Sequence, residues 1–154
     1  MGMGNLFSAT MISGSGLTAE RMRMEVAANN IANANSTSSA TGGAYRRQQV
    51  VFAAAMEQAN GNGAAGHSAP QTVSAMNGVQ VVGVEPDQSP LPRVHNPGHP
   101  DADADGYVEM PNVFLPNEMI DLMTANRAYE ANLKSLQTFR QMAEQALSLM
   151  RASG

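Results

Sequence analysis

The stretch Met119–Met150, MIDLMTANRAYEANLKSLQTFRQMAEQALSLM, decides the fold of this chain. Its apolar positions step by three and four residues, which is the a/d repeat of a helix that packs against other helices. The residues of this stripe are Met119, Leu122, Tyr129, Leu133, Leu136, Ala143, Leu147 and Met150. Because the repeat is sustained from one end of the stretch to the other, we predict one long helix that needs helical partners.

Two polar residues, Asn126 and Arg140, occupy positions of the same stripe. Asn126 has two readings. Either the register drifts and leaves it at the solvent edge, or it is a buried polar residue that selects register and partner at a cost in stability. We expect Arg140 at the edge of the stripe, where its aliphatic part packs and its charge reaches water.

The N-terminal region carries a second helical repeat. Its apolar members, spaced by seven residues, are Leu17, Met24 and Ile31. We expect a helix from Thr18, as its N-cap, to about Asn33. Residues 5–12 would form a separate short helix, because each glycine of Ser13–Gly16 (SGSG) costs about 1 kcal/mol in a helix interior. One continuous helix from residue 5 is the alternative, if neighbouring elements pack tightly on the glycines.

The region between the two repeats is rich in glycine, proline and polar residues. We expect strands at 45–52, 78–85, 91–94 and 107–110, and a mobile loop at 57–77. The predicted organisation is an N-terminal helical segment at 1–37, a middle region at 38–115 and a C-terminal heptad helix at 116–154. The fold class is therefore mainly α with a small β-rich middle. The two long terminal helices would pack as a coiled coil completed by neighbouring subunits.

Composition limits what the chain can do. Its 154 residues include twelve methionines but only four phenylalanines, three tyrosines and no tryptophan, so a core inside one subunit would be thin. The net charge of −4 argues against nucleic acid as a partner. Cysteine is absent, which excludes disulfides and thiol nucleophiles. No apolar run is long enough to insert in a membrane, and the first residues lack the basic segment of a cleaved secretory signal peptide.

The acidic segment Asp101–Gly106, DADADG, matches the first half of a calcium-binding loop. Asn112 stands where that loop needs a bidentate glutamate, so an acidic turn is the favoured reading over a calcium-binding module. His95 and His99 have a zinc-like spacing, but no further clustered ligand supports them. No catalytic motif is found either. We therefore expect no cofactor, no metal and no enzymatic activity.

Several segments together resemble the flagellar rod and hook protein family. Residues 27–37, AANNIANANST, resemble the N-terminal signature of that family. Residues 45–52 (YRRQQVVF), 101–113 (DADADGYVEMPNV) and 118–132 (EMIDLMTANRAYEAN) are similar to its proximal rod members. The matching segments cover both ends of the chain and the start of the middle region.

The resemblance implies a structural subunit of the bacterial flagellar basal-body rod, which transmits torque across the periplasm. Its implied partners are other copies of itself, other rod subunits, the base ring of the basal body, and the flagellar type III apparatus that exports it without a cleaved signal. The assembly interface would consist of Leu17, Met24, Ile31, Met119, Leu122, Asn126, Tyr129, Leu133, Leu136, Leu147 and Met150. Another rod or hook-basal axial subunit is the nearest alternative, and the calcium-binding interaction module is a more distant one.

Overall fold

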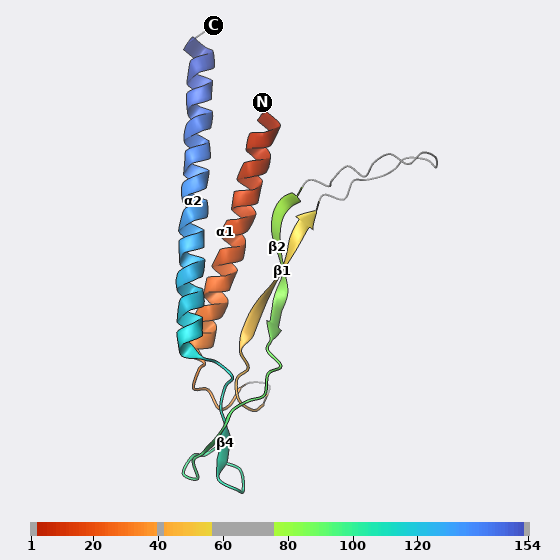
Figure 1. Cartoon of the computed structure of the whole chain (residues 1–154), viewed down its shortest axis with the longest axis vertical. Helices are drawn as coiled ribbons and strands as arrows, with labels where there is room; N and C mark the ends of the chain where they lie inside the picture. Colours follow the sequence, from red (N-terminus) through yellow and green to blue (C-terminus); the bar gives the residue numbers. More distant parts are fainter. Residues whose placement is uncertain (1–2, 40–41, 57–75, 153–154) are drawn as a thin grey trace, which may run out of the picture.

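The computed structural model describes residues 3–39, 42–56 and 76–152, and they form an elongated molecule (Figure 1). Two long antiparallel helices lie side by side, a two-stranded hairpin lies along the first helix, and a small ribbon forms the tip beyond the helices. The elements are α1 (Met3–Ala32), β1 (Gln48–Met56), β2 (Met76–Pro86), β3 (Arg93–His95), β4 (Tyr107–Glu109) and α2 (Leu115–Ala152). The predicted fold class, two packed terminal helices around a small β-rich middle, is confirmed in these terms.

Helix α1 runs without a break through Ser13–Gly16, so the predicted interruption there is wrong and the alternative of a continuous helix is right. Thr18 is not an N-cap but an interior residue whose hydroxyl donates to the Gly14 carbonyl at 3.3 Å. Neighbouring elements pack on this part of the helix at Ser15 and Gly16, whereas a Cβ atom on Gly14 would meet nothing within 4 Å. The C-terminal end agrees with expectation, since α1 ends at Ala32, one residue before Asn33.

Two glycines permit this close packing. A Cβ atom on Gly16 would lie 3.0 Å from the side-chain nitrogen of Asn132 on α2. Gly78 of β2 has a positive φ of 112°, and a Cβ atom there would collide with the Ser15 side chain of α1. Ser15 in turn accepts a hydrogen bond from the Val79 amide at 3.1 Å. Helix α1 is thus held between α2 and the hairpin.

The strands lie close to where the sequence predicts them, with shifted ends. β1 pairs antiparallel with β2, Gln48 opposite Pro86 and Val50 opposite Val84, so the first strand begins and ends a few residues later than predicted. β3 pairs antiparallel with β4 through Arg93–Glu109, Val94–Val108 and His95–Tyr107. The loop predicted at 57–77 lies outside the described residues, except for its last two residues, which belong to β2.

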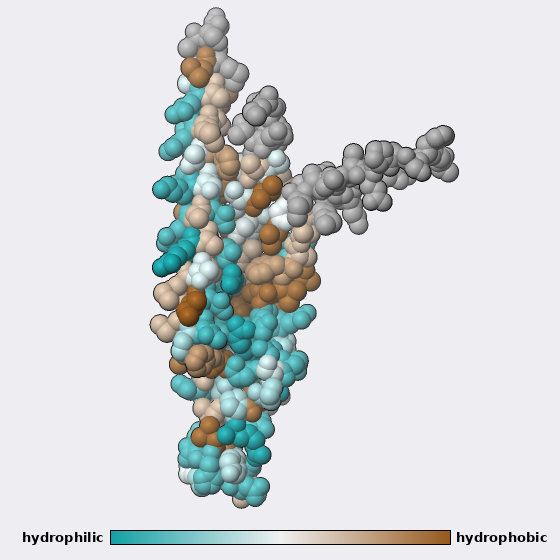
Figure 2. All heavy atoms as spheres, in the orientation of Figure 1, coloured by the Kyte–Doolittle hydropathy of each residue, from teal (hydrophilic) through white to brown (hydrophobic). Residues whose placement is uncertain are grey.

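Small residues dominate the buried part of the molecule, as the low content of aromatic residues suggests. Among the described residues, the buried apolar side chains are Ala19, Ala27, Ala34, Ala44, Val108 and Ala125. Larger apolar side chains gather over the hairpin, while the base of the helices and the tip are mainly hydrophilic on the face shown in Figure 2. Neither described helix contains an apolar stretch suited to crossing a lipid bilayer.

Candidate functional site

The residues of α2 that face α1 recur with heptad spacing, and they include both polar and apolar side chains. Glu118 and Asn132 contact α1 directly, through Asn30 and Gly16. Residues at the same helical spacing are buried or half-buried: Leu122, Ala125, Tyr129, Leu136, Phe139 and Ala143. The interface between the helices therefore combines small, polar and large apolar side chains.

The predicted interface residues divide into two groups. Half-buried within the subunit are Leu17, Met24, Ile31, Leu122, Tyr129 and Leu136. By contrast, Met119, Leu133 and Leu147 are 55%, 41% and 51% exposed. These three are fourteen residues apart, two heptads, with Asn126 and Arg140 at the heptad positions between them. They lie on the flank of the face that packs on α1, and we call them the exposed row. The side chain of Met150 lies outside the described residues.

The two polar residues of the predicted stripe are both exposed in the subunit. Asn126 donates to the Glu130 carboxylate on its own helix at 3.1 Å. Arg140 forms an ion pair with Glu144 at 2.9 Å, again one turn along the helix. Asn126 therefore does not serve as a buried polar residue between α1 and α2. Arg140 is exposed as expected, but its side chain is 82% exposed, so its aliphatic part does not pack within the subunit.

A buried polar network ties α1, β1 and α2 together at their common base, with Asn30 at its centre. Asn30 is 1% exposed, and its side-chain amide makes four hydrogen bonds. Its nitrogen donates to the Gln48 carbonyl at 2.9 Å and to Glu118 at 2.8 Å. Its oxygen accepts from the Gln48 amide and from the Tyr45 hydroxyl, each at 2.9 Å. The amide of Asn30 thus pairs with the backbone of Gln48 as a neighbouring strand would.

Glu118 supplies the charge of this network from the first turn of α2. It is 1% exposed, and its second carboxylate oxygen accepts from Arg47 Nε at 2.5 Å. The amide groups at the N-terminus of a helix favour a negative charge in this position. Arg47 is held in turn, because its backbone amide donates to the Asn112 side chain at 2.8 Å. A buried carboxylate is thereby compensated on both oxygens.

The edge of the network is more open to solvent. Asp121, one turn along α2, lies 3.3 Å from Arg47 and 3.4 Å from Arg23 of α1. Burial raises the pKa of Tyr45 above its ordinary value, and the negative charge of Glu118 adds to the effect. The network therefore links four charged side chains and one phenol from α1, α2 and the segment that leads into β1.

Sequence reasoning missed the network residues, Asn30, Arg47 and Glu118. All three lie inside segments that carry the family resemblance, but none belongs to the apolar repeat. A search for polar residues at the helical spacing of the interface would have found Asn30 and Glu118. It would not have found Arg47, which is brought to them only by the fold.

In the tip of the molecule, two carboxylates of the acidic segment accept hydrogen bonds from groups of the protein. Asp103 accepts from the backbone amides of Tyr107 and Asp105 at 2.8 and 3.0 Å, and it also pairs with Arg93. The Tyr107 amide is the main cause of a lowered pKa for Asp103. Asp101 accepts instead from the Thr37 hydroxyl at 2.7 Å. These carboxylates are turned to separate partners.

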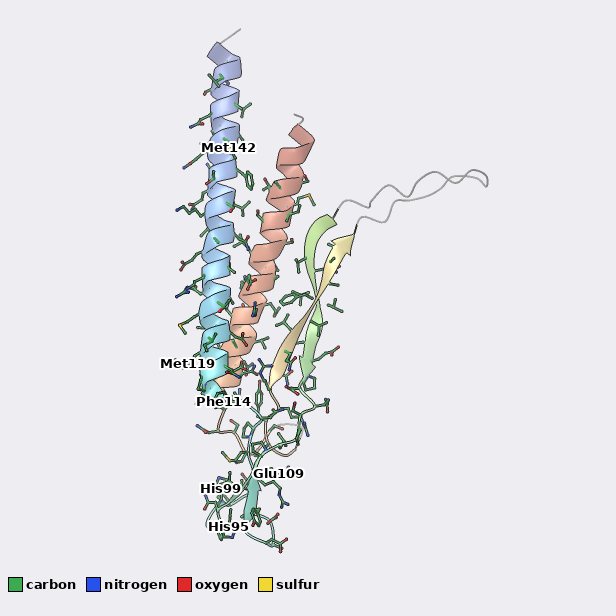
Figure 3. All side chains as sticks on the ribbon, viewed as in Figure 1. His95, His99, Glu109, Phe114, Met119 and Met142 are labelled. Atoms are coloured by element: carbon green, nitrogen blue, oxygen red, sulfur yellow. The ribbon has the colours of Figure 1, made fainter. Side chains whose placement is uncertain are left out.

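His95 and His99 both lie in the tip, away from Phe114 and Met119 at the base of α2 (Figure 3). His95 packs edge-on against Tyr107, with ring centroids 5.1 Å apart. His99 accepts from the Asp101 amide at 3.1 Å. Within the part of the chain that the structure describes, no group of three or more His, Asp or Glu side chains could hold a metal ion.

Comparison with known proteins identifies the family. The family described as "Flagella basal body rod protein" matches residues 12–41, and that described as "Flagellar basal body rod FlgEFG protein C-terminal" matches residues 104–149. These two segments contain most of α1, the network residue Asn30, and most of α2 including Glu118.

Full-length relatives match over nearly the whole chain. The flagellar basal-body rod protein FlgC of Borreliella burgdorferi is 40% identical over 151 residues, covering 94% of this chain and 97% of the relative. FlgC of Escherichia coli is 42% identical over 149 residues, covering 97% and 98%. FlgC of Bacillus subtilis is 35% identical over 155 residues, covering 93% and 97%. The chain belongs to the flagellar basal-body rod protein FlgC family, and it is a structural, non-enzymatic subunit of the rod.

Proposed function

We propose that the exposed row of α2, formed by Met119, Leu133 and Leu147, is the surface that binds helices of neighbouring subunits in the rod. The observation that carries this proposal is its exposure: three large apolar side chains, at every second position of one heptad series, remain open after α1 has packed on the adjacent face. Apolar side chains spaced in this way pack into the grooves of another helix. Other rod subunits, including further copies of this chain, are the proposed occupants.

The thin interior of the subunit supports the same proposal. The buried apolar residues among the described ones are mostly alanines, each of which contributes little buried area. The row's side chains are much larger. Each is about half exposed in the subunit, so completing its burial would gain about half of the roughly 1.5–3 kcal/mol that burying a whole side chain contributes. Assembly would therefore supply apolar burial that the isolated subunit lacks. A helix pair stabilised on both sides in this way would transmit torque along the rod.

The proposal also names the specific partners of the subunit. Membership of the rod family supports assembly with rod subunits, and we extend this to contact with the base ring of the basal body. Export through the flagellar type III apparatus without a cleaved signal peptide would bring the subunit to the rod. Asn126 and Met150 of the predicted interface would then lie next to the neighbour that covers the exposed row.

The test replaces Leu133 by aspartate in motile cells that carry no other copy of the gene. A charge without a partner in an apolar helix interface is costly, so rod assembly and swimming should be lost while the subunit is still exported. The matched control is Thr138→Asp, which places the same charge on an exposed polar position of α2. Normal swimming of the Leu133→Asp strain would contradict the proposal.

A further inference from the structure

The alignment of α1 and α2 along their axes, their register, depends mainly on contacts at the base of the helix pair. Asn30 contacts Glu118, and Gly16 contacts Asn132; these pairs are fourteen residues apart on each helix and so define one antiparallel register. Between them the fully buried apolar side chains of this face are Ala19 and Ala125, while the larger Leu122 and Tyr129 are only half-buried. Small side chains pack closely in more than one register.

A shift of one heptad would preserve much of this packing. It moves the helices by about 10.5 Å along their axes, since each residue rises about 1.5 Å. Gly16 would then face Phe139, a residue for which a glycine leaves room, and Asn30 would face Ala125. The apolar contacts of the interface therefore discriminate weakly against this register.

The polar network discriminates strongly, because its groups have partners only in the observed register. In the shifted register Asn30 would lose its hydrogen bond to Glu118, and Glu118 would lose one of its two partners. Buried polar groups without partners are disfavoured far more than a displaced methyl group. A single buried polar residue fixes the register of helices in other coiled coils by this means.

From this asymmetry we infer that the hydrogen bond between Asn30 and Glu118, held by Gln48 and Arg47, is the register lock of the two terminal helices. The lock also fixes the hairpin, because the same amide of Asn30 pairs with the backbone at the start of β1. Both helices and the hairpin are therefore set relative to one another from one point. This inference concerns the subunit alone and does not depend on which surface binds its neighbours.

The absence of cysteine in the chain allows a direct test with introduced pairs. The full chain carrying Gly16→Cys with Asn132→Cys reports the observed register, because these positions are in contact. The chain carrying Gly16→Cys with Phe139→Cys reports the register shifted by one heptad. Disulfides form only between residues whose Cα atoms lie within about 7 Å, so each pair reads one register. Oxidation is carried out on dilute subunit, and only cross-links within one chain are counted.

In the otherwise unchanged protein the first pair should cross-link at least about tenfold more than the second, because the shifted pair lies beyond disulfide reach. The same pairs are then measured with Asn30→Leu and Glu118→Leu together, which replaces both partners by apolar side chains. The cross-link of the shifted pair should rise to within about threefold of the first, as expected when the buried pair no longer selects the register and only the more exposed Arg23–Asp121 ion pair remains between the helices. The matched control is Asn126→Leu with Glu130→Leu, which removes an exposed hydrogen bond of the same chemistry on α2. It should leave the ratio unchanged.

Two results would overturn the inference. If the ratio stays as in the unchanged protein, the packing of the helices and the remaining Arg23–Asp121 ion pair set the register without the buried hydrogen bond. If the apolar replacement abolishes both cross-links, the network is required for the helices to pair at all and does not select between registers. A variant with Glu118→Gln, which keeps an acceptor for Asn30, should retain the observed register.

Discussion

Replacing Glu118 by alanine should destabilise the subunit by about 3 kcal/mol, because removing one partner of a buried ion pair costs about 3–5 kcal/mol. The change leaves Arg47 Nε and one amide proton of Asn30 without an acceptor. The value falls at the lower end of the range, since the Arg47 side chain is 24% exposed and keeps Asp121 at 3.3 Å. The loss includes the favourable position of Glu118 at the N-terminus of α2.

The assay is urea unfolding of the purified subunit, followed by far-UV circular dichroism. At about 2–4 °C per kcal/mol for a chain of this size, the melting temperature should also fall by about 6–12 °C. The matched control is Glu130→Ala, which removes a carboxylate that accepts from an asparagine on the exposed face of the same helix. It should change the free energy of unfolding by less than about 0.5 kcal/mol. If Glu118→Ala unfolds at the same urea concentration as its control, the network contributes no stability and our reasoning about it is wrong.

Two further predictions concern Tyr45 and Asp103. Because the pKa of Tyr45 is raised in the folded state, that state keeps the phenolic proton to higher pH, so its stability should fall as pH rises above the ordinary value of 10.0. Tyr45→Phe should weaken this alkaline loss, measured as the difference in urea midpoint between pH 8 and pH 11. The substitution should also lower the free energy of unfolding by about 1 kcal/mol, because the hydrogen bond to Asn30 is lost. An unchanged alkaline loss would exclude Tyr45 as its source. The lowered pKa of Asp103 means that its contribution to the tip is present above the ordinary value of 3.8 and is lost as pH falls below it. Asp103→Ala should speed hydrogen exchange at the Tyr107 amide at neutral pH without changing exchange in α2, and equal rates at Tyr107 would show that the carboxylate does not hold the turn.

The two terminal helices could be predicted from the sequence because an apolar repeat with a helical period, sustained over many turns, is typical of packed helices and of little else. The continuity of α1 could not. The cost of a glycine in Ser13–Gly16 is a local property, whereas the contacts that hold this part of the helix come from Asn132 on α2, against Gly16, and from Gly78 on β2, against Ser15. Only the folded arrangement brings those residues to the helix.

The composition of the helix interface was harder still to predict. A search for large apolar side chains selected Met119 and Leu133, which are exposed, and passed over Glu118 and Ala125, which are buried. Close packing of α1 on α2 places small and polar residues on the inner face. An apolar repeat can therefore lie either on the inner face of the helix or on the flank beside it, and the sequence does not distinguish the two. The two can be separated only once the partner helix is in place.

The central claim is that the exposed row becomes buried when subunits assemble. Because the chain has no cysteine, Leu133→Cys introduces one thiol whose reaction with a maleimide reports exposure at that position. The isolated subunit should react fully, rods purified with intact basal bodies should react at least about tenfold more slowly, and rods dissociated in urea should react fully again, as expected for a side chain buried in a helix interface. Equal reaction rates in the isolated subunit and in intact rods would contradict the account.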